Sequence, residues 1–204
     1  MHSTQDLASD SRLKEALRRI ESFPALDPSA MLYERLSKPI SAGQTGTMLR
    51  GNWLGHALHP LLTDLALGCW LGAGLLDLFG GKESQRAATK LVGAGLLAAV
   101  PTTFSGAAEW PNLMDRSSRR VAVVHATGNL ALIICYLTSW LLRRNGKRNA
   151  GLAWGMAGGC LGWMTGYLGG HLSFGRGVGH GERWATESQA SSRPDETDPG
   201  TGDD

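Results

Sequence analysis

This sequence of 204 residues has few cysteines, no apolar run at its N-terminus and little net charge. Its three cysteines lie singly within apolar stretches, which excludes a local disulfide framework and a CxxC metal or redox motif. The first 19 residues contain no apolar run, so we expect no signal peptide. The formal net charge is only +2, and no cluster of Lys and Arg interleaves with aromatic residues. These features argue against nucleic-acid binding.

Charged residues are also missing from three long internal stretches. These stretches comprise residues 91–108, 121–142 and 150–170, which are 18, 22 and 21 residues long. A fourth apolar stretch, Pro60–Phe79, carries only Asp64 and Asp77 as charged residues. A helix of about 20 apolar residues crosses the roughly 30 Å hydrocarbon core of a bilayer. The sequence therefore predicts an integral membrane protein with four spans.

The connections between these spans are short, at about 82–88, 111–120 and 143–149. Short connections permit only an up-down-up-down order, which predicts an all-α, antiparallel four-helix bundle. We expect three regions: an N-terminal extension with short helices (1–52), the bundle (53–179) and a disordered acidic tail (180–204).

The N-terminal extension carries signals for short helices. The segment from Ser11 to Ile20 has an amphipathic pattern and is predicted to lie outside the bilayer or along its surface. Asp27 and Pro28 are typical of a helix start, and Pro39 is expected to end that helix. Three glycines between residues 43 and 51 predict a loop.

Histidines gather at one end of the predicted bundle. We call the membrane face nearest both chain ends side A. His56 and His59 precede or begin the first span on this side, His125 begins the third, and His171 ends the fourth. Glu109 ends the second span on the same side. Four histidines and a carboxylate from separate spans are therefore expected to converge near side A.

Two further polar residues share helical faces with these histidines. Asp64 follows His56 at multiples of four residues, and Asn129 lies four residues after His125. Because an unpaired ionisable group within a bilayer is costly, we expect Asp64 to face the bundle interior. In the fourth span, a stripe that includes Gly166 and Gly170 allows close approach of another helix or of a flat ligand.

Several imidazoles beside a glycine-lined slot favour a b-type haem, which takes two axial histidines from facing helices. The leading hypothesis is a membrane electron-transfer protein with His59 and His125 as axial ligands and His56 and His171 as alternates. Asp64 or Asn129 would hold the second ring nitrogen, Gly166 and Gly170 would line the slot, and Arg120 is a candidate propionate partner.

Two alternatives stay open. One is a non-haem Zn, Fe, Mn or Cu site that uses the four histidines with Asp64 or Glu109. The other is a structural or docking subunit of a larger membrane complex, without a cofactor, whose polar groups satisfy one another. In each case, an electron-transfer or accessory role is favoured over a stand-alone enzyme.

The distribution of positive charge predicts the orientation. The two loops opposite side A carry seven Lys and Arg residues, against six near side A. By the positive-inside rule, side A, the histidine cluster and both termini are expected outside the cytoplasm.

Long motifs carry a resemblance to a known family. They are LRGNWLGHALHPLLTD (49–64), SGAAEW (105–110), RRVAVVHATGN (119–129) and GYLGGHLSFGRGVG (166–179). Over about residues 37–179 the chain resembles an uncharacterised bacterial four-span membrane domain, which in many actinobacterial relatives is followed by a Rieske [2Fe-2S] domain. The resemblance implies a multi-pass protein of the bacterial cytoplasmic membrane, close to electron transfer.

The sequence departs from this family pattern in two places. After Gly179 it has neither the paired Cys-x-His motifs nor the length of a Rieske domain, so a Rieske-type partner would be a separate chain. A proline that is usual in the family after the LTD motif is Ala66 here, which makes a kink in the first span less expected.

Overall fold

A computed structural model describes residues 4–178, with side chains from Arg12 onward. Within this range every regular element is a helix, which confirms the predicted fold class. The predicted disordered tail, 180–204, lies outside the described residues.

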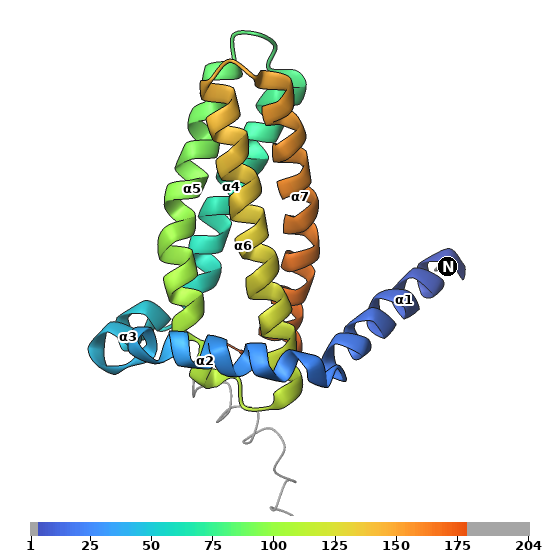
Figure 1. Ribbon diagram of the computed structural model, residues 1–204, viewed down its shortest axis with the longest axis vertical. Coiled ribbons are helices and arrows are strands. Elements are labelled where there is room, and N and C mark those ends of the chain that lie inside the picture. Colours follow the sequence, from blue (N-terminus) through green and yellow to red (C-terminus); the bar gives the residue numbers. More distant parts are fainter. Residues whose placement is uncertain (1–3, 179–204) are drawn as a thin grey trace, which may run out of the picture.

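Four long helices form an antiparallel bundle (Figure 1). They are α4 (Leu58–Phe79), α5 (Gln85–Ala108), α6 (Arg116–Arg144) and α7 (Arg148–Gly170). The side chain of Asp115 caps α6 by accepting a hydrogen bond of 2.8 Å from the Ser118 amide. α4 packs closely on α5 and α6 closely on α7, whereas the two hairpins contact each other more loosely.

Three of the described helices, α4, α5 and α6, are long and apolar enough to cross a membrane. α7 has 23 residues and no charged residue after Arg148, and it packs along α6. Its glycines lower its hydropathy, but they also allow the close helix contact that completes the bundle.

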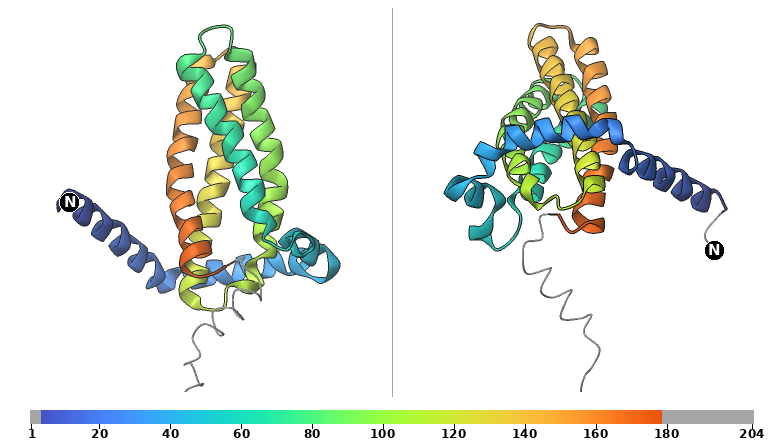
Figure 2. Two further views of the ribbon diagram at one scale, coloured as in Figure 1. Left: turned by 180° about the vertical axis from the view of Figure 1, so that it is seen from behind. Right: turned by 60° about the horizontal axis from the view of Figure 1, so that its bottom comes forward.

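The N-terminal extension forms three helices at the side A end. They are α1 (Thr4–Glu21), α2 (Asp27–Ser41) and α3 (Gly43–Arg50). α2 lies across the ends of α5 and α6, while α1 projects away from the bundle (Figures 1 and 2). Salt bridges hold α2 in place, from Arg120 to Asp27 at 2.7 Å and from Arg119 to Glu34 at 3.1 Å.

Two local predictions for this extension were wrong. α2 continues past Pro39 to Ser41, because a proline in the last turn removes only one helical hydrogen bond. The segment predicted as a loop is α3: Gly43 and Gly51, with φ of +57° and +83°, lie at its boundaries rather than interrupting it.

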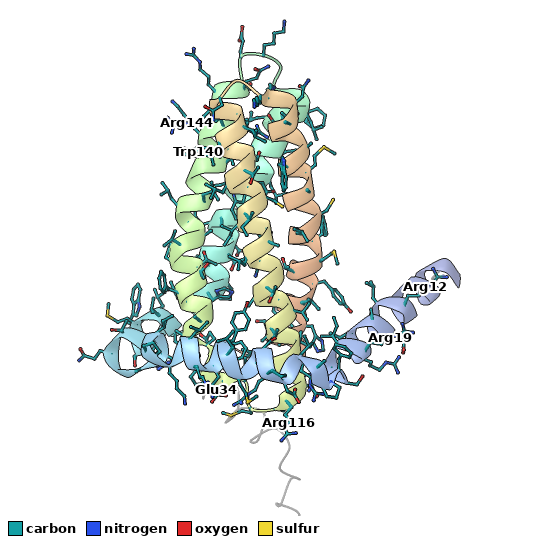
Figure 3. All side chains as sticks on the ribbon, in the orientation of Figure 1. Arg12, Arg19, Glu34, Arg116, Trp140 and Arg144 are labelled. Atoms are coloured by element: carbon teal, nitrogen blue, oxygen red, sulfur yellow. The ribbon has the colours of Figure 1, made fainter. Side chains whose placement is uncertain are left out.

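Two contacts in the bundle core join α4 to α6 across the two hairpins. Near the middle, the rings of Trp70 and Tyr136 stack with centroids 4.2 Å apart. Near the end opposite side A, Arg143 donates two hydrogen bonds, of 3.0 and 2.6 Å, to the buried carboxylate of Asp77. On the surface of the same end, the Arg144 guanidinium lies over the Trp140 ring (Figure 3).

Candidate functional site

Two histidines from different hairpins meet near the side A end of the bundle. His59 lies in the first turn of α4, and His125 lies within α6. Their ring centroids are 6.5 Å apart and the ring planes are inclined by 76°. We call these two side chains the histidine pair. The predicted convergence of histidines is thus found for two of the four residues.

Backbone carbonyls of the neighbouring helices fix the tautomer of both rings. Nδ1 of His59 lies 2.9 Å from the Thr102 carbonyl oxygen, and Nδ1 of His125 lies 2.9 Å from the Thr165 carbonyl oxygen. Because a carbonyl oxygen only accepts hydrogen bonds, each Nδ1 must carry the proton. In the neutral ring Nε2 then holds a lone pair, which is the form that ligates metals.

Two glycines make room for the rings between the helices. A Cβ added to Gly106 would lie 2.8 Å from Cε1 of His59, and one added to Gly169 would lie 2.8 Å from Cε1 of His125. Any side chain at these positions would displace a ring, so glycine is required for this packing.

The other two histidines do not join the pair. Nδ1 of His56, an exposed residue, is within hydrogen-bond distance of the neighbouring Ala57 carbonyl oxygen. Nε2 of His171 lies 3.1 Å from a Glu21 carboxylate oxygen, which also accepts a hydrogen bond from Arg176. His171 therefore tethers α1 to the end of α7.

The carboxylates of the predicted site also lie apart from the pair. Asp64 is exposed on the outer face of α4, which corrects the expectation that it faces the interior. Glu109 is buried and accepts a hydrogen bond of 2.6 Å from Asn112, and burial raises the pKa of its carboxyl group.

The structure places the remaining candidates as follows. Nδ2 of Asn129 lies 3.0 Å from Nε2 of His125 and donates a hydrogen bond to it. Gly166 and Gly170 have open space where a Cβ would be, so the glycines that contact the rings are different ones. Arg120 binds Asp27 bidentately and donates to the Glu21 carbonyl, and it therefore anchors α2.

Sequence reasoning missed the groups that hold the rings. They are the carbonyls of Thr102 and Thr165 and the two contacting glycines; the Ser105 hydroxyl also lies 3.2 Å from Nδ1 of His59. One signal was available: a Thr followed four residues later by Gly occurs at 102–106 and again at 165–169, on the helix after each histidine.

A family model described as "Predicted membrane protein (DUF2231)" matches residues 55–182, a range that contains all four bundle helices. The chain belongs to this family. The histidine pair therefore lies within the DUF2231 domain, whereas α1–α3 precede it.

The chain is also similar to the fluoride-specific ion channel FluC 1 of Rubrobacter xylanophilus. The two sequences are 35% identical over 105 residues, which is 48% of this chain and 82% of the relative. No solved structure matches the chain significantly.

Proposed function

We propose that this DUF2231 protein holds a b-type haem between His59 and His125 and transfers electrons at the side A end of the membrane. The observation that carries the proposal is a pair of imidazoles from two hairpins, each with Nδ1 bonded to a carbonyl and Nε2 as the lone-pair nitrogen. When bound, the haem supplies a one-electron redox centre, and the protein supplies its ligands and an apolar surrounding.

The separation of the two rings would admit a single metal between them. A metal bound at about 2.0 Å from Nε2 lies about 3.2 Å from the ring centroid. The observed centroid separation of 6.5 Å would leave room for one metal held by both rings if each Nε2 turned toward it.

The number of available ligands points the same way. Within residues 4–178, no group of three or more His, Cys, Asp or Glu side chains is placed to hold a metal ion. A zinc site normally needs three or four protein ligands, whereas haem iron needs two or one because the porphyrin provides four nitrogens. The histidine pair is therefore better suited to haem than to a bare metal ion.

A haem at the pair would lie between the two hairpins, because the hairpins contact each other more loosely than the helices within each hairpin do. Propionates need cations, and Arg119, Arg120 and Arg176 are engaged with carboxylates. Arg50 forms no salt bridge with any residue that the structure describes, although it lies near Glu109, and it donates to the Ser41 and Ala108 carbonyl oxygens, so we assign it this role.

Electron transfer requires a partner, and the partner is expected on side A because the pair lies near that end. A separate Rieske-type protein is one candidate, as is a larger membrane complex. We place side A outside the cytoplasm of a bacterial inner membrane, on the basis of the small excess of Lys and Arg on the opposite loops.

Fluoride conduction is a second candidate, supported by the similarity to FluC 1 over most of that relative's length. The tautomers of the histidine pair count against it at this position. An anion needs hydrogen-bond donors, but Nε2 of His59 carries a lone pair and Nε2 of His125 carries one that accepts from Asn129. The pair is therefore better suited to a metal than to an anion.

An absorption spectrum of the purified protein in detergent tests the proposal. We expect a Soret band that shifts on reduction with dithionite, and its loss in both His59→Ala and His125→Ala. His56→Ala is the matched control, because His56 is exposed and apart from the pair.

The possible results separate the candidates. An unchanged haem content in both pair variants would contradict the ligand assignment. A colourless protein that releases fluoride from loaded liposomes would support the channel. A colourless protein with stoichiometric metal would support the non-haem site, and a colourless protein with neither metal nor fluoride release would support the docking subunit.

A further inference from the structure

The helix α2 runs across the bundle axis at the side A end, whereas α4 to α7 run along that axis (Figures 1 and 2). The ring of Tyr33 in α2 stacks on Trp110, two residues after the end of α5, with centroids 5.6 Å apart. Tyr and Trp are enriched at the level of the lipid headgroups. Because the bundle axis crosses the bilayer, α2 is oriented parallel to the membrane plane at this level.

The contacts of α2 with α6 show which edge of α2 faces the hydrocarbon. Asp27 binds Arg120 near the start of α6. Tyr33 instead reaches Thr127, and the two hydroxyl oxygens are 3.0 Å apart. Thr127 lies seven residues after Arg120 in α6, which is about 10 Å deeper at 1.5 Å per residue. The edge of α2 that carries Tyr33 therefore faces the membrane interior.

The edge that faces the membrane interior is apolar. Leu36 and Ile40 follow Tyr33 by three and seven residues and therefore share its edge. Leu36 is 58% exposed, and Leu32, one turn before it, is 55% exposed. α2 packs on α5 and α6, which are long and apolar enough to cross a membrane. The apolar edge of α2 thus extends the lipid-facing surface of these two spans to the headgroup level.

The exposed charge of α2 is positive and lies on the other edge. Both carboxylates of the helix, Asp27 and Glu34, are bound by arginines of α6. Both cations of the helix, Arg35 and Lys38, are exposed. They lie about 160° and 140° around the helix from Tyr33. α2 therefore presents an apolar edge toward the hydrocarbon and two cations toward water.

We propose that α2 is an in-plane membrane helix whose partner is the lipid leaflet on side A. Leu32, Leu36 and Ile40 contact the acyl chains, and Arg35 and Lys38 bind the phosphates of anionic headgroups. Amphipathic helices with this distribution of residues bind membrane interfaces. The surface needs no cofactor, so this inference is independent of the proposed haem function.

The test compares two cysteine variants of the full-length protein in phosphatidylcholine vesicles. Leu36→Cys places a thiol on the apolar edge. Met31→Cys is the matched control, because Met31 is 55% exposed and lies about 160° around the helix from Tyr33. A neutral maleimide too large to cross the membrane labels the thiols, and peptide mass spectrometry identifies the labelled residue.

We expect Leu36→Cys to be labelled about ten-fold more slowly than Met31→Cys, because the reactive thiolate forms poorly in an apolar environment. After unfolding in SDS the two rates should become equal. The comparison of two sites on one helix also removes the effect of protein orientation in the vesicles.

Vesicles that contain phosphatidylglycerol test the two cations. Anionic lipid should increase the ratio of the two labelling rates by about five-fold per cation, because it holds α2 more firmly to the surface. This increase should disappear when Arg35→Gln and Lys38→Gln are combined. Lys82→Gln with Arg86→Gln is the matched control, because it removes two exposed cations at the opposite end of the bundle and should retain the increase.

Three results would overturn the inference. Equal labelling of Leu36→Cys and Met31→Cys in vesicles would show that the apolar edge does not contact lipid. A ratio that does not respond to phosphatidylglycerol, or that responds equally without Arg35 and Lys38, would contradict headgroup binding by these cations. A disulfide between two copies of Leu36→Cys would show that a second copy of the chain, rather than lipid, covers this edge.

Discussion

Replacing Gly169 by alanine is expected to displace the His125 ring of the histidine pair. The added Cβ would lie 2.8 Å from Cε1 and 3.3 Å from Nδ1 of His125. Ordinary carbon contacts begin near 3.4 Å, so the ring must move by about 0.6 Å. Moving it that far stretches its 2.9 Å hydrogen bond to the Thr165 carbonyl toward the limit of such bonds.

The size of the effect follows from two contributions. Overpacking of this kind costs about 1–3 kcal/mol, and a lost hydrogen bond costs about 1 kcal/mol. A total of about 2–4 kcal/mol lowers the Tm of a protein of this size by about 4–16 °C. We also expect less bound haem, because the ring moves into the space between the hairpins.

Thermal unfolding in detergent, combined with haem content, measures both effects. Gly166→Ala is the matched control on the same helix, because its Cβ would enter open space and alanine is the better helix former. Its Tm should equal or exceed that of the wild type. If Gly169→Ala had the wild-type Tm and haem content, the packing of the pair described above would be refuted.

Three other parts of the structure give further predictions. Asp77→Leu should lower stability by about 3–5 kcal/mol because it leaves the buried Arg143 unpaired, and Asp77→Leu with Arg143→Leu should recover only part of that loss in the same melts, because Arg148 also donates to Asp77. The Arg120 hydrogen bond lowers the pKa of Asp27, so this contact is intact above the unfolded pKa of 3.8 and is lost as the pH falls through the lowered folded pKa. Limited proteolysis should therefore cut α2 faster at the acid end of a pH series, and a cleavage rate that stays constant over the whole series would contradict this. Burial raises the pKa of Glu109, so its contribution to stability falls as the pH rises above 4.5. Glu109→Gln should therefore raise the Tm at pH 8 more than at pH 4. A smaller gain in Tm at pH 8 than at pH 4 would contradict this reasoning.

The bundle was predictable because lipid imposes a strong constraint on sequence. Stretches of about 20 residues without charge identified the helices, and short connections determined their order. The end at which the histidines gather followed from that order alone. The details of α2 and α3 were less predictable, since a proline or glycine near a helix end is compatible with more than one boundary.

The sequence predicted less well which residues of each helix face the bundle interior, and helix geometry explains why. His59 and Asp64 are five residues apart, which is about 140° around a helix, so they cannot both face the interior. Helix packing determines which of the two residues faces the interior, and in the structure it is His59. In the same way Gly169, rather than Gly166 or Gly170, faces His125, because α7 turns that side toward α6.

The groups that hold the rings could not be predicted by considering the side chains one at a time. The Thr102 and Thr165 carbonyls are backbone atoms, which every residue type offers, so no side-chain pattern marks them. The repeated spacing of Thr and Gly on α5 and α7 becomes informative only when the two hairpins are compared.

The most direct test of the account is the optical spectrum of the protein purified after expression with a haem precursor. We predict a Soret band that shifts on reduction, with one haem per chain, present in His56→Ala and absent from His59→Ala and His125→Ala. A wild-type protein that stays folded and colourless under these conditions would contradict the central claim that the histidine pair binds haem.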